Sequence, residues 1–345
     1  MGLQILRITA AFLVLITHSS FYASERLDHH FSSWENGARG VDIFFILSGF
    51  VMIYSSTKLM KSANGWKVFA WRRIVRIVPM YWIATTIKVL ALLLTTGLAL
   101  HAQFSISKTL ESYFFLPSIN MDGEIRPVLG VGWTLNFEMF FYFLFALALL
   151  LRVNVYKFVG IILALFSLGA FFRKPGWPPI AFYLDTIVLE FFFGMLIAKA
   201  CLANKHIPRY LALPLMAVGF IALLGPFPHG GLPQGVVSGL PAALIILSMV
   251  ALEDSMTRIP RLILYMADAS YVIYLFHPLI APSVPMILLK LHLRYPLLSV
   301  ACSITLALAV GCLIHSLVET PITNWFRDHV IIGREKVIHK VTVPE

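Results

Sequence analysis

The chain has 345 residues, of which 59% are hydrophobic and only 13% are charged. Soluble domains carry about a quarter charged residues, so this composition excludes a soluble globular protein. The formal net charge of +10 does not indicate nucleic-acid binding, because the basic residues lie between apolar runs rather than on one face. The cysteines lie in or beside apolar runs without metal-type spacing, so we expect no metal site. They are Cys201, Cys302 and Cys312.

Apolar runs of about 18 to 22 residues recur along the chain, and this is the length that a helix needs to cross a bilayer. The sequence therefore predicts an all-α, polytopic transmembrane helix bundle of about ten spans. Because most Lys and Arg residues fall in alternate connections, we expect both termini to be cytoplasmic. The predicted spans are 3–21, 40–57, 77–98, 133–151, 155–172, 182–202, 207–225, 236–252, 268–289 and 297–317.

The first span contains two ionisable residues, Arg7 and His18. Eleven positions are nearly three helical turns, so both side chains lie on one face, about 16 Å apart along the axis. Ionisable groups within a span usually face a bundle interior or a wet cavity. Two plainer readings remain open. The segment could be a signal peptide cleaved after Ala23, or Arg7 could be a snorkelling anchor and His18 an interfacial residue.

The second span begins with Asp42 near its outer end, at the depth that His18 reaches on the first span. A carboxylate beside an imidazole fixes its tautomer and raises its basicity, as general-base catalysis requires. The alternative, equally supported by the spacing, is that Asp42 only caps the N-terminus of its own helix.

Residues 58–76 are basic and aromatic, and this composition suits a helix that lies along the membrane interface. Arg72 and Arg76 are four residues apart and share a helix face. Two adjacent guanidinium groups can bind a phosphate between them. The alternative is an ordinary cluster of positive charge on the cytoplasmic side.

The next connection, residues 101–132, is predicted to lie outside as a loop over an external cavity. The fourth span then places Glu138 about one turn inside an apolar helix, on the same face as Thr134 and Tyr142. A glutamate buried in a membrane span usually has either a charged partner or a function. Both interpretations remain: Glu138 could form a structural ion pair with a cation, or it could have a functional role.

The ninth span places Ser270, Tyr274 and His277 on one face, and Pro278 leaves a carbonyl one turn earlier without its helix donor. His277 could line a ligand site or mark a helix kink. At the end of the tenth span, Glu319 is expected at the cytoplasmic mouth near the arginines, with a salt bridge as the leading interpretation.

Six motifs occur in order between residues 7 and 321. They are Arg7-x10-His18; Gly40-Val41-Asp42-Ile43-Phe44-Phe45 with Leu47-Ser48-Gly49-Phe50; Arg72-Arg73-Ile74-Val75-Arg76-Ile77-x-Pro79; Trp133-Thr134-Leu135 with Glu138 and Tyr142; Ser270-Tyr271 with Tyr274-Leu275-x-His277; and Glu319-x-Pro321. In this combination the chain resembles the acyltransferase 3 family of integral-membrane O-acyltransferases.

The resemblance implies that residues 1–320 form the acyltransferase 3 transmembrane domain and that residues 321–345 form a short cytoplasmic tail. It implies a protein of the bacterial inner membrane, in contact with membrane lipid, that transfers an acyl group, typically acetyl, from cytoplasmic acyl-CoA. The implied acceptor is a hydroxyl of a surface carbohydrate or a related molecule. No metal and no nucleic acid are implied.

The resemblance also implies roles for individual residues. His18 would be the catalytic base or a transient acyl carrier, Asp42 its orienting partner, and Glu138 a residue that positions the acceptor hydroxyl. The residues expected to bind the phosphates of acyl-CoA are Arg7, Arg72, Arg73 and Arg76. The residues expected to line the chamber are Trp133, Tyr142, Tyr274, His277 and Glu319.

These roles define an expected route. The arginines would lie on the cytoplasmic side, and His18, Asp42 and Glu138 toward the other side. A pantetheine arm of about 15 to 20 Å would then span the distance from Arg7 to His18 that the helix rise gives. This route needs one connected chamber. A proton-coupled secondary transporter or flippase, and a scaffold without catalysis, are the other classes. The acceptor, the acyl length and the oligomeric state are not predicted.

Overall fold

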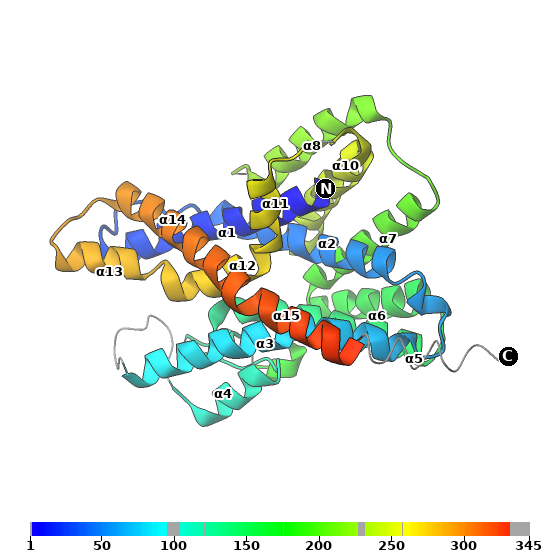
Figure 1. Ribbon diagram of the computed structural model, residues 1–345, viewed down its shortest axis with the longest axis horizontal. Helices are drawn as coiled ribbons and strands as arrows, with labels where there is room; N and C mark the ends of the chain where they lie inside the picture. Colours follow the sequence, from blue (N-terminus) through cyan, green and yellow to red (C-terminus); the bar gives the residue numbers. More distant parts are fainter. Residues whose placement is uncertain are drawn as a thin grey trace.

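The computed structural model describes residues 2–94, 104–120, 122–174, 176–226, 232–256 and 258–331. These residues form an α-helical bundle with one isolated β-bridge, between Ile119 and Ile125 (Figure 1). The helices are α1 (Gly2–Arg26), α2 (Gly40–Ser55), α3 (Gly65–Leu94), α4 (Ile106–Tyr113), α5 (Trp133–Leu150), α6 (Val155–Gly169), α7 (Leu189–Leu202), α8 (Arg209–Leu224), α9 (Gln234–Val237), α10 (Gly239–Leu252), α11 (Arg261–Asp268), α12 (Ser270–Ile280), α13 (Ser283–Lys290), α14 (Pro296–Ile314) and α15 (Thr320–Phe326).

The all-helical membrane bundle is confirmed. Each predicted span contains a helix, and eight helices in the described part of the chain are long and apolar enough to cross a membrane. Two others are shorter, α7 with 14 residues and α8 with 16. The number of spans and the side on which each terminus lies therefore stay predictions.

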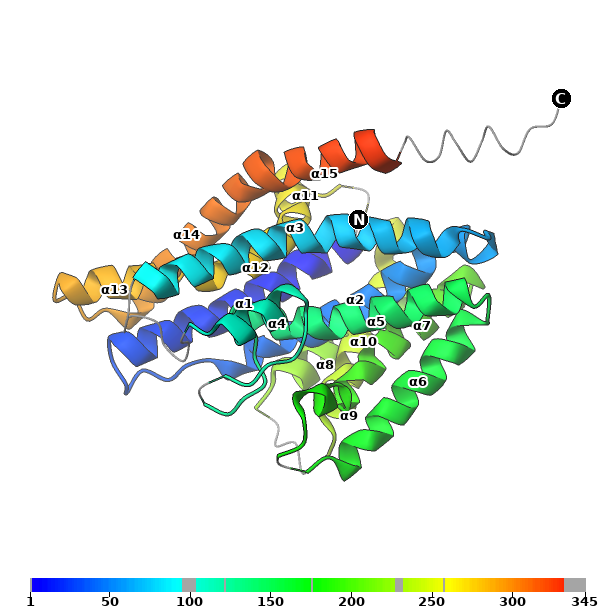
Figure 2. The same cartoon turned by 90° about the horizontal axis from the view of Figure 1, so that it is seen from below.

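Helix α1 runs through the middle of the bundle (Figure 2). It contacts α2, α10, α11, α12, α13 and α14. Its buried residues include Leu6, Ala10, Val14 and Leu15. This central packing makes α1 an integral helix of the bundle, which argues against the signal-peptide reading of the segment.

Close approach of α2 and α7 depends on two glycines. A Cβ atom at Gly49 would lie 2.0 Å from the carbonyl oxygen of Phe191, and one at Gly194 would lie 2.0 Å from that of Ile46. Small residues let the backbones of membrane helices pack this tightly. The packing brings the N-terminal ends of α2 and α7 together, which matters for Asp42 below.

Two connections differ from the prediction. Residues 65–76 do not form a separate interfacial helix, because they are the first turns of α3, which continues without a break through Pro79 to Leu94. Its 30 residues rise about 45 Å, more than the roughly 30 Å of a hydrocarbon core, so part of α3 extends beyond it. The connection after α3 contains a further helix, α4.

The C-terminal helix also continues past the expected domain boundary. A π-helical segment, His315–Glu319, joins α14 to α15, and helical structure then runs on to Ile331. The chain therefore shows no structural break between residues 320 and 321 (Figure 1). The rest of the predicted tail, residues 332–345, lies outside the described residues.

Candidate functional site

One cavity lies between α1, α2, α3, α5 and α12 and has a volume of about 120 Å³. We call it the arginine cavity. Its polar lining residues are Arg7, Ser48, Arg73, Arg76, Thr134, Glu138, Tyr142, Tyr271 and Tyr274. Three guanidinium groups and one carboxyl group give this lining a positive charge, which suits an anionic ligand.

Glu138 lies in this cavity and accepts two hydrogen bonds. One comes from the Ser48 hydroxyl at 3.2 Å, and the other is a short bond from the Tyr142 hydroxyl. The Arg73 guanidinium lies 5.9 Å from the centre of the Tyr142 ring. Glu138 was expected toward the outer, acceptor side with His18 and Asp42, whereas α5 places it in the arginine cavity with Arg7, Arg73 and Arg76.

The arginine pair that lines the cavity is Arg73 with Arg76, three residues apart. Arg72 was expected to form the clamp with Arg76, but it is not among the described residues that line this cavity. Successive residues of an α-helix are about 100° apart around its axis. The rotation of α3 about its axis therefore decides which arginine points into the cavity. The same-face argument for Arg72 and Arg76 did not fix that rotation.

The second cavity is larger, about 720 Å³, and we call it the histidine cavity. His18 lines it, together with the loop before α5. Its other lining residues include Phe21, Tyr22, Glu35, Lys88, Asn120, Asp122, Glu124, Arg126, Val131, Trp133 and Pro278. The prediction that this connection borders a cavity is confirmed.

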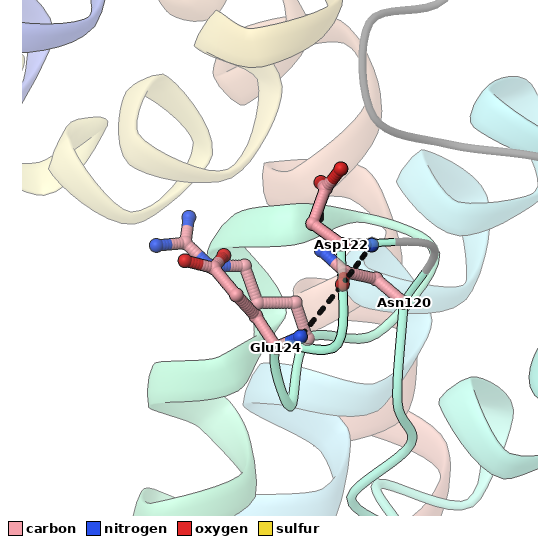
Figure 3. A network of polar contacts seen from close by, with 4 residues as sticks. Asn120, Asp122 and Glu124 are labelled. Atoms are coloured by element: carbon pink, nitrogen blue, oxygen red, sulfur yellow. Dashed lines mark hydrogen bonds and ion pairs between the residues drawn. The ribbon is translucent and has the colours of Figure 1, made fainter.

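A hydrogen-bonded turn holds the polar residues of that loop in place (Figure 3). The side-chain oxygen of Asn120 accepts from the backbone N–H groups of Asp122 and Glu124, each at 2.9 Å. The Glu124 carboxylate pairs with Arg126 at 2.8 Å. The loop therefore presents acidic, amide and guanidinium groups together at the rim of the histidine cavity.

His18 is bonded to a second histidine rather than to a carboxylate. Its Nδ1 lies 2.6 Å from Nε2 of His277, with the ring centres 4.8 Å apart. Nδ1 of His277 lies 2.6 Å from the carbonyl oxygen of Tyr274. His277 is 1% exposed, so this pair is held in the protein interior.

Asp42 does not orient His18. It is 1% exposed, and its carboxyl group faces that of Glu190, which is fully buried on α7. The tight packing of α2 on α7 explains this pairing. The expected Asp42–His18 dyad is therefore wrong as a contact. The alternative, a cap on the N-terminus of α2, is not found either, because this helix end has no side-chain cap hydrogen bond.

Residues at the boundary of the two cavities form what we call the wall. Trp133 lines the histidine cavity, whereas its neighbour Thr134 lines the arginine cavity. The hydroxyl groups of Thr134 and Tyr274 are hydrogen-bonded at 2.9 Å, and both reach the carbonyl oxygen of Val131. Arg7 and His18 therefore line different cavities, with these hydrogen-bonded residues at the boundary, and the connected chamber expected from the sequence stays a prediction.

The remaining expected residue, Glu319, is not among the lining residues of either cavity. Its carboxyl group lies 2.5 Å from Nδ1 of His315, within the π-helical segment. This contact is a salt bridge only when the histidine is protonated, so the salt-bridge interpretation stays a prediction. Within the described residues, no group of three or more His, Cys, Asp or Glu side chains could hold a metal ion.

Among the charged residues within apolar runs, sequence reasoning missed Lys88, which lines the histidine cavity, and the buried Glu190. Lys88 is the single charged residue of the run 77–98, and Glu190 lies inside the run 182–202. A charged residue within an apolar run is itself a signal of function or of a buried partner. That signal was present in the sequence for both.

Comparisons with known proteins identify the family of this chain. The acyltransferase 3 family model, described as an acyltransferase domain, matches residues 2–316. The exopolysaccharide production protein ExoZ of Rhizobium meliloti (strain 1021) is 37% identical over 264 residues, which cover 74% of this chain and 80% of that protein. No solved structure matches the chain. With nearly its whole length matched, this chain belongs to the acyltransferase 3 family of membrane acyltransferases.

Proposed function

We propose that this protein is an O-acyltransferase of the bacterial inner membrane that moves an acetyl group from cytoplasmic acyl-CoA to a hydroxyl of a surface carbohydrate. Both termini would be cytoplasmic. The observation that carries the proposal is the placing of Arg7 and His18 on one buried helix, each lining a different cavity. Donor and acceptor can then bind from opposite sides of the membrane. The family assignment favours acyl transfer over a transporter.

The donor side is the arginine cavity. Arg7, Arg73 and Arg76 supply the guanidinium groups that bind phosphate oxygens in pairs. Its volume of about 120 Å³ is well below the roughly 300 to 1,000 Å³ of a typical ligand pocket. A cavity of this size holds only part of an acyl-CoA molecule, so binding of the whole donor requires it to widen.

The acceptor side is the histidine cavity, whose volume of about 720 Å³ falls within the usual range for a ligand pocket. Trp133 and Tyr22 offer aromatic faces, and the Asn120–Arg126 loop offers hydrogen-bond donors and acceptors. Aromatic rings and polar planar groups together suit the apolar and hydroxylated faces of a sugar. The name of the Rhizobium relative, an exopolysaccharide production protein, supports a carbohydrate acceptor.

The reaction joins the two sides at His18. The imidazole removes the proton of the acceptor hydroxyl as the oxygen attacks the thioester carbonyl carbon. The C–S bond breaks, an ester forms, and the CoA thiolate takes the proton back from the imidazolium. For the thioester to reach His18, the wall at Thr134 and Tyr274 must open.

The test is transfer of label from [¹⁴C]acetyl-CoA to glycan extracted from cells that lack the gene, using membranes that contain the protein. We expect label in glycan with the native protein and a loss of at least about 100-fold with His18→Ala, the scale of general-base catalysis. The matched control is His29→Ala, an exposed histidine outside both cavities. Full transfer by His18→Ala at normal membrane abundance would remove His18 from this role.

Mass spectrometry of surface glycans from cells with and without the gene identifies the acceptor. A mass gain of one acyl group in the presence of the gene is the expected result. A gain that corresponds to a longer acyl chain would keep the enzyme class and change the donor.

A further inference from the structure

Pro278 determines the hydrogen bonding of His277. Proline has no N–H, so the carbonyl group four residues earlier in α12, that of Tyr274, lacks its usual helix donor. Nδ1 of His277 lies 2.6 Å from this carbonyl oxygen. A carbonyl oxygen only accepts hydrogen bonds, so Nδ1 of His277 carries the proton.

The proton on Nδ1 of His277 decides the state of its other nitrogen. In a neutral imidazole only one nitrogen is protonated, so Nε2 of His277 is an acceptor. The atom 2.6 Å away is Nδ1 of His18, which must then be the donor. His18 is therefore protonated at Nδ1, and its Nε2 carries the free electron pair.

We propose that His277 is the positioning residue of His18, selecting the tautomer in which Nε2 of His18 is the base available to the histidine cavity. The inference rests on the proposed function and assigns one nitrogen atom to the proton transfer. All three residues of this arrangement lie on α12, in the sequence Tyr274-x-x-His277-Pro278. Pro278 leaves the Tyr274 carbonyl group without its helix donor, and Nδ1–H of His277 donates to that group instead.

The proton balance closes within the pair. As the acceptor oxygen attacks the thioester carbon, its proton moves to Nε2 of His18, and the positive charge is shared with His277 through the Nδ1–Nε2 hydrogen bond. When the C–S bond breaks, the thiolate takes the proton from Nε2 of His18. Both histidines return to their starting tautomers, and no outside acid or base is consumed.

Two substitutions separate the two hydrogen bonds of His277. In His277→Gln, the amide oxygen can lie near the position of Nε2 and accept from His18. In His277→Asn, the shorter amide can donate to the Tyr274 carbonyl but does not reach His18. The matched control is Tyr274→Phe, which keeps the backbone carbonyl and so leaves the donor–acceptor order of the pair unchanged.

The direct readout is ¹⁵N NMR of histidine-labelled protein in nanodiscs, with the His18 signals assigned by comparison with His18→Ala. We expect the Nδ1–H tautomer of His18 in the native protein, in Tyr274→Phe and in His277→Gln. We expect its loss in His277→Asn. An Nε2–H tautomer in the native protein, or a tautomer unchanged in His277→Asn, would overturn the inference without touching the proposed function.

The kinetic readout uses [¹⁴C]acetyl-CoA and extracted glycan, as above. We expect kcat to fall at least about 100-fold in His277→Asn, because His18 then no longer presents its base nitrogen to the acceptor. In His277→Gln, which keeps the acceptor for His18, we expect a decrease of no more than about 10-fold. The KM for acetyl-CoA should not change in either. Equal decreases of kcat in His277→Asn and His277→Gln would show that His277 has only a structural role. Full activity of His18→Ala would instead contradict the proposed function itself.

Discussion

The hydroxyl oxygen of Tyr274 lies 2.9 Å from Oγ1 of Thr134, and this hydrogen bond lies in the wall between the arginine cavity and the histidine cavity. Tyr274 also supplies the carbonyl group that holds His277. One residue therefore contributes its side chain to the barrier and its backbone to the histidine pair. A rotation of the Tyr274 side chain can open the barrier while the carbonyl stays in place.

Removing that hydrogen bond should make the wall easier to open. A net hydrogen bond contributes about 0.5 to 1.5 kcal/mol, so Tyr274→Phe and Thr134→Val should each shift opening by about 2- to 10-fold. We expect a matching rise in the release of free CoA from acetyl-CoA without acceptor. The double variant should show less than the sum of the two single effects, because both substitutions remove the bond between Thr134 and Tyr274, while each hydroxyl also reaches the carbonyl oxygen of Val131.

The control for this experiment is Tyr265→Phe, which removes a tyrosine hydroxyl that bonds to Ser316 and the Cys312 carbonyl, outside both cavities. It should leave the release of CoA unchanged. Additive effects of Tyr274→Phe and Thr134→Val would show that the two hydroxyl groups do not act as one closure.

The arginines make a second prediction. Arg73 and Arg76 line the cavity and Arg72 does not, so Arg73→Ala and Arg76→Ala should raise the KM for acetyl-CoA more than Arg72→Ala. Hydrogen bonds to charged groups contribute about 1.5 to 3 kcal/mol, which is a rise of roughly 10- to 100-fold. Arg73→Lys should recover part of the affinity, because it keeps the charge and loses the paired N–H groups.

Steady-state kinetics over a range of acetyl-CoA concentrations measures these effects. A larger KM for Arg72→Ala than for Arg73→Ala would restore the clamp expected from the i, i+4 spacing. It would also mean that α3 rotates when the donor binds.

Helical periodicity was sufficient to predict some of this site. The eleven-residue spacing of Arg7 and His18 predicts one face and two depths, and the structure has both residues on α1 with each lining its own cavity. The frequency and length of the apolar runs predicted the helical bundle for the same reason, since both depend on local sequence.

Contacts between distant segments could not be predicted in this way. The partner of His18 is 259 residues away, and Asp42 meets Glu190 only because glycines let α2 and α7 pack closely. No local pattern marks such contacts. The rotation of α3, which selects Arg73 over Arg72, is likewise set by its packing on α5 and α12.

Glu138 gives a third prediction, because it accepts from Ser48 and Tyr142 in a cavity with three arginines. Glu138→Ala leaves both hydroxyl groups without this acceptor and should cost about 1 to 3 kcal/mol of stability. Glu138→Gln keeps an acceptor oxygen and removes one negative charge, so we expect near-native stability and an unchanged or lower KM for acetyl-CoA. Thermal unfolding in detergent and donor kinetics measure the two effects.

The same variant tests the role implied by the family resemblance. If Glu138 positions the acceptor hydroxyl, Glu138→Gln must raise the KM for glycan rather than alter the KM for acetyl-CoA. The location of Glu138 with the arginines leads us to expect the opposite result.

The buried pair of Asp42 and Glu190 gives the last prediction. Two carboxyl groups that face each other in the protein interior repel when both are charged. An amide at either position removes this repulsion and can donate a hydrogen bond to the remaining carboxyl group. Asp42→Asn and Glu190→Gln should therefore fold normally, and kcat should stay within about 10-fold of native, because His277 and not Asp42 orients His18.

Glu190→Ala is the contrasting variant, since it leaves a space and a buried carboxyl group without its partner. It should cost about 1 to 3 kcal/mol and lower the thermal unfolding temperature, as well as the amount of protein in the membrane. Normal folding of Asp42→Asn with a loss of transfer as large as that of His18→Ala would contradict the argument. Asp42 would then act on the imidazole in a conformation reached only when donor and acceptor are bound.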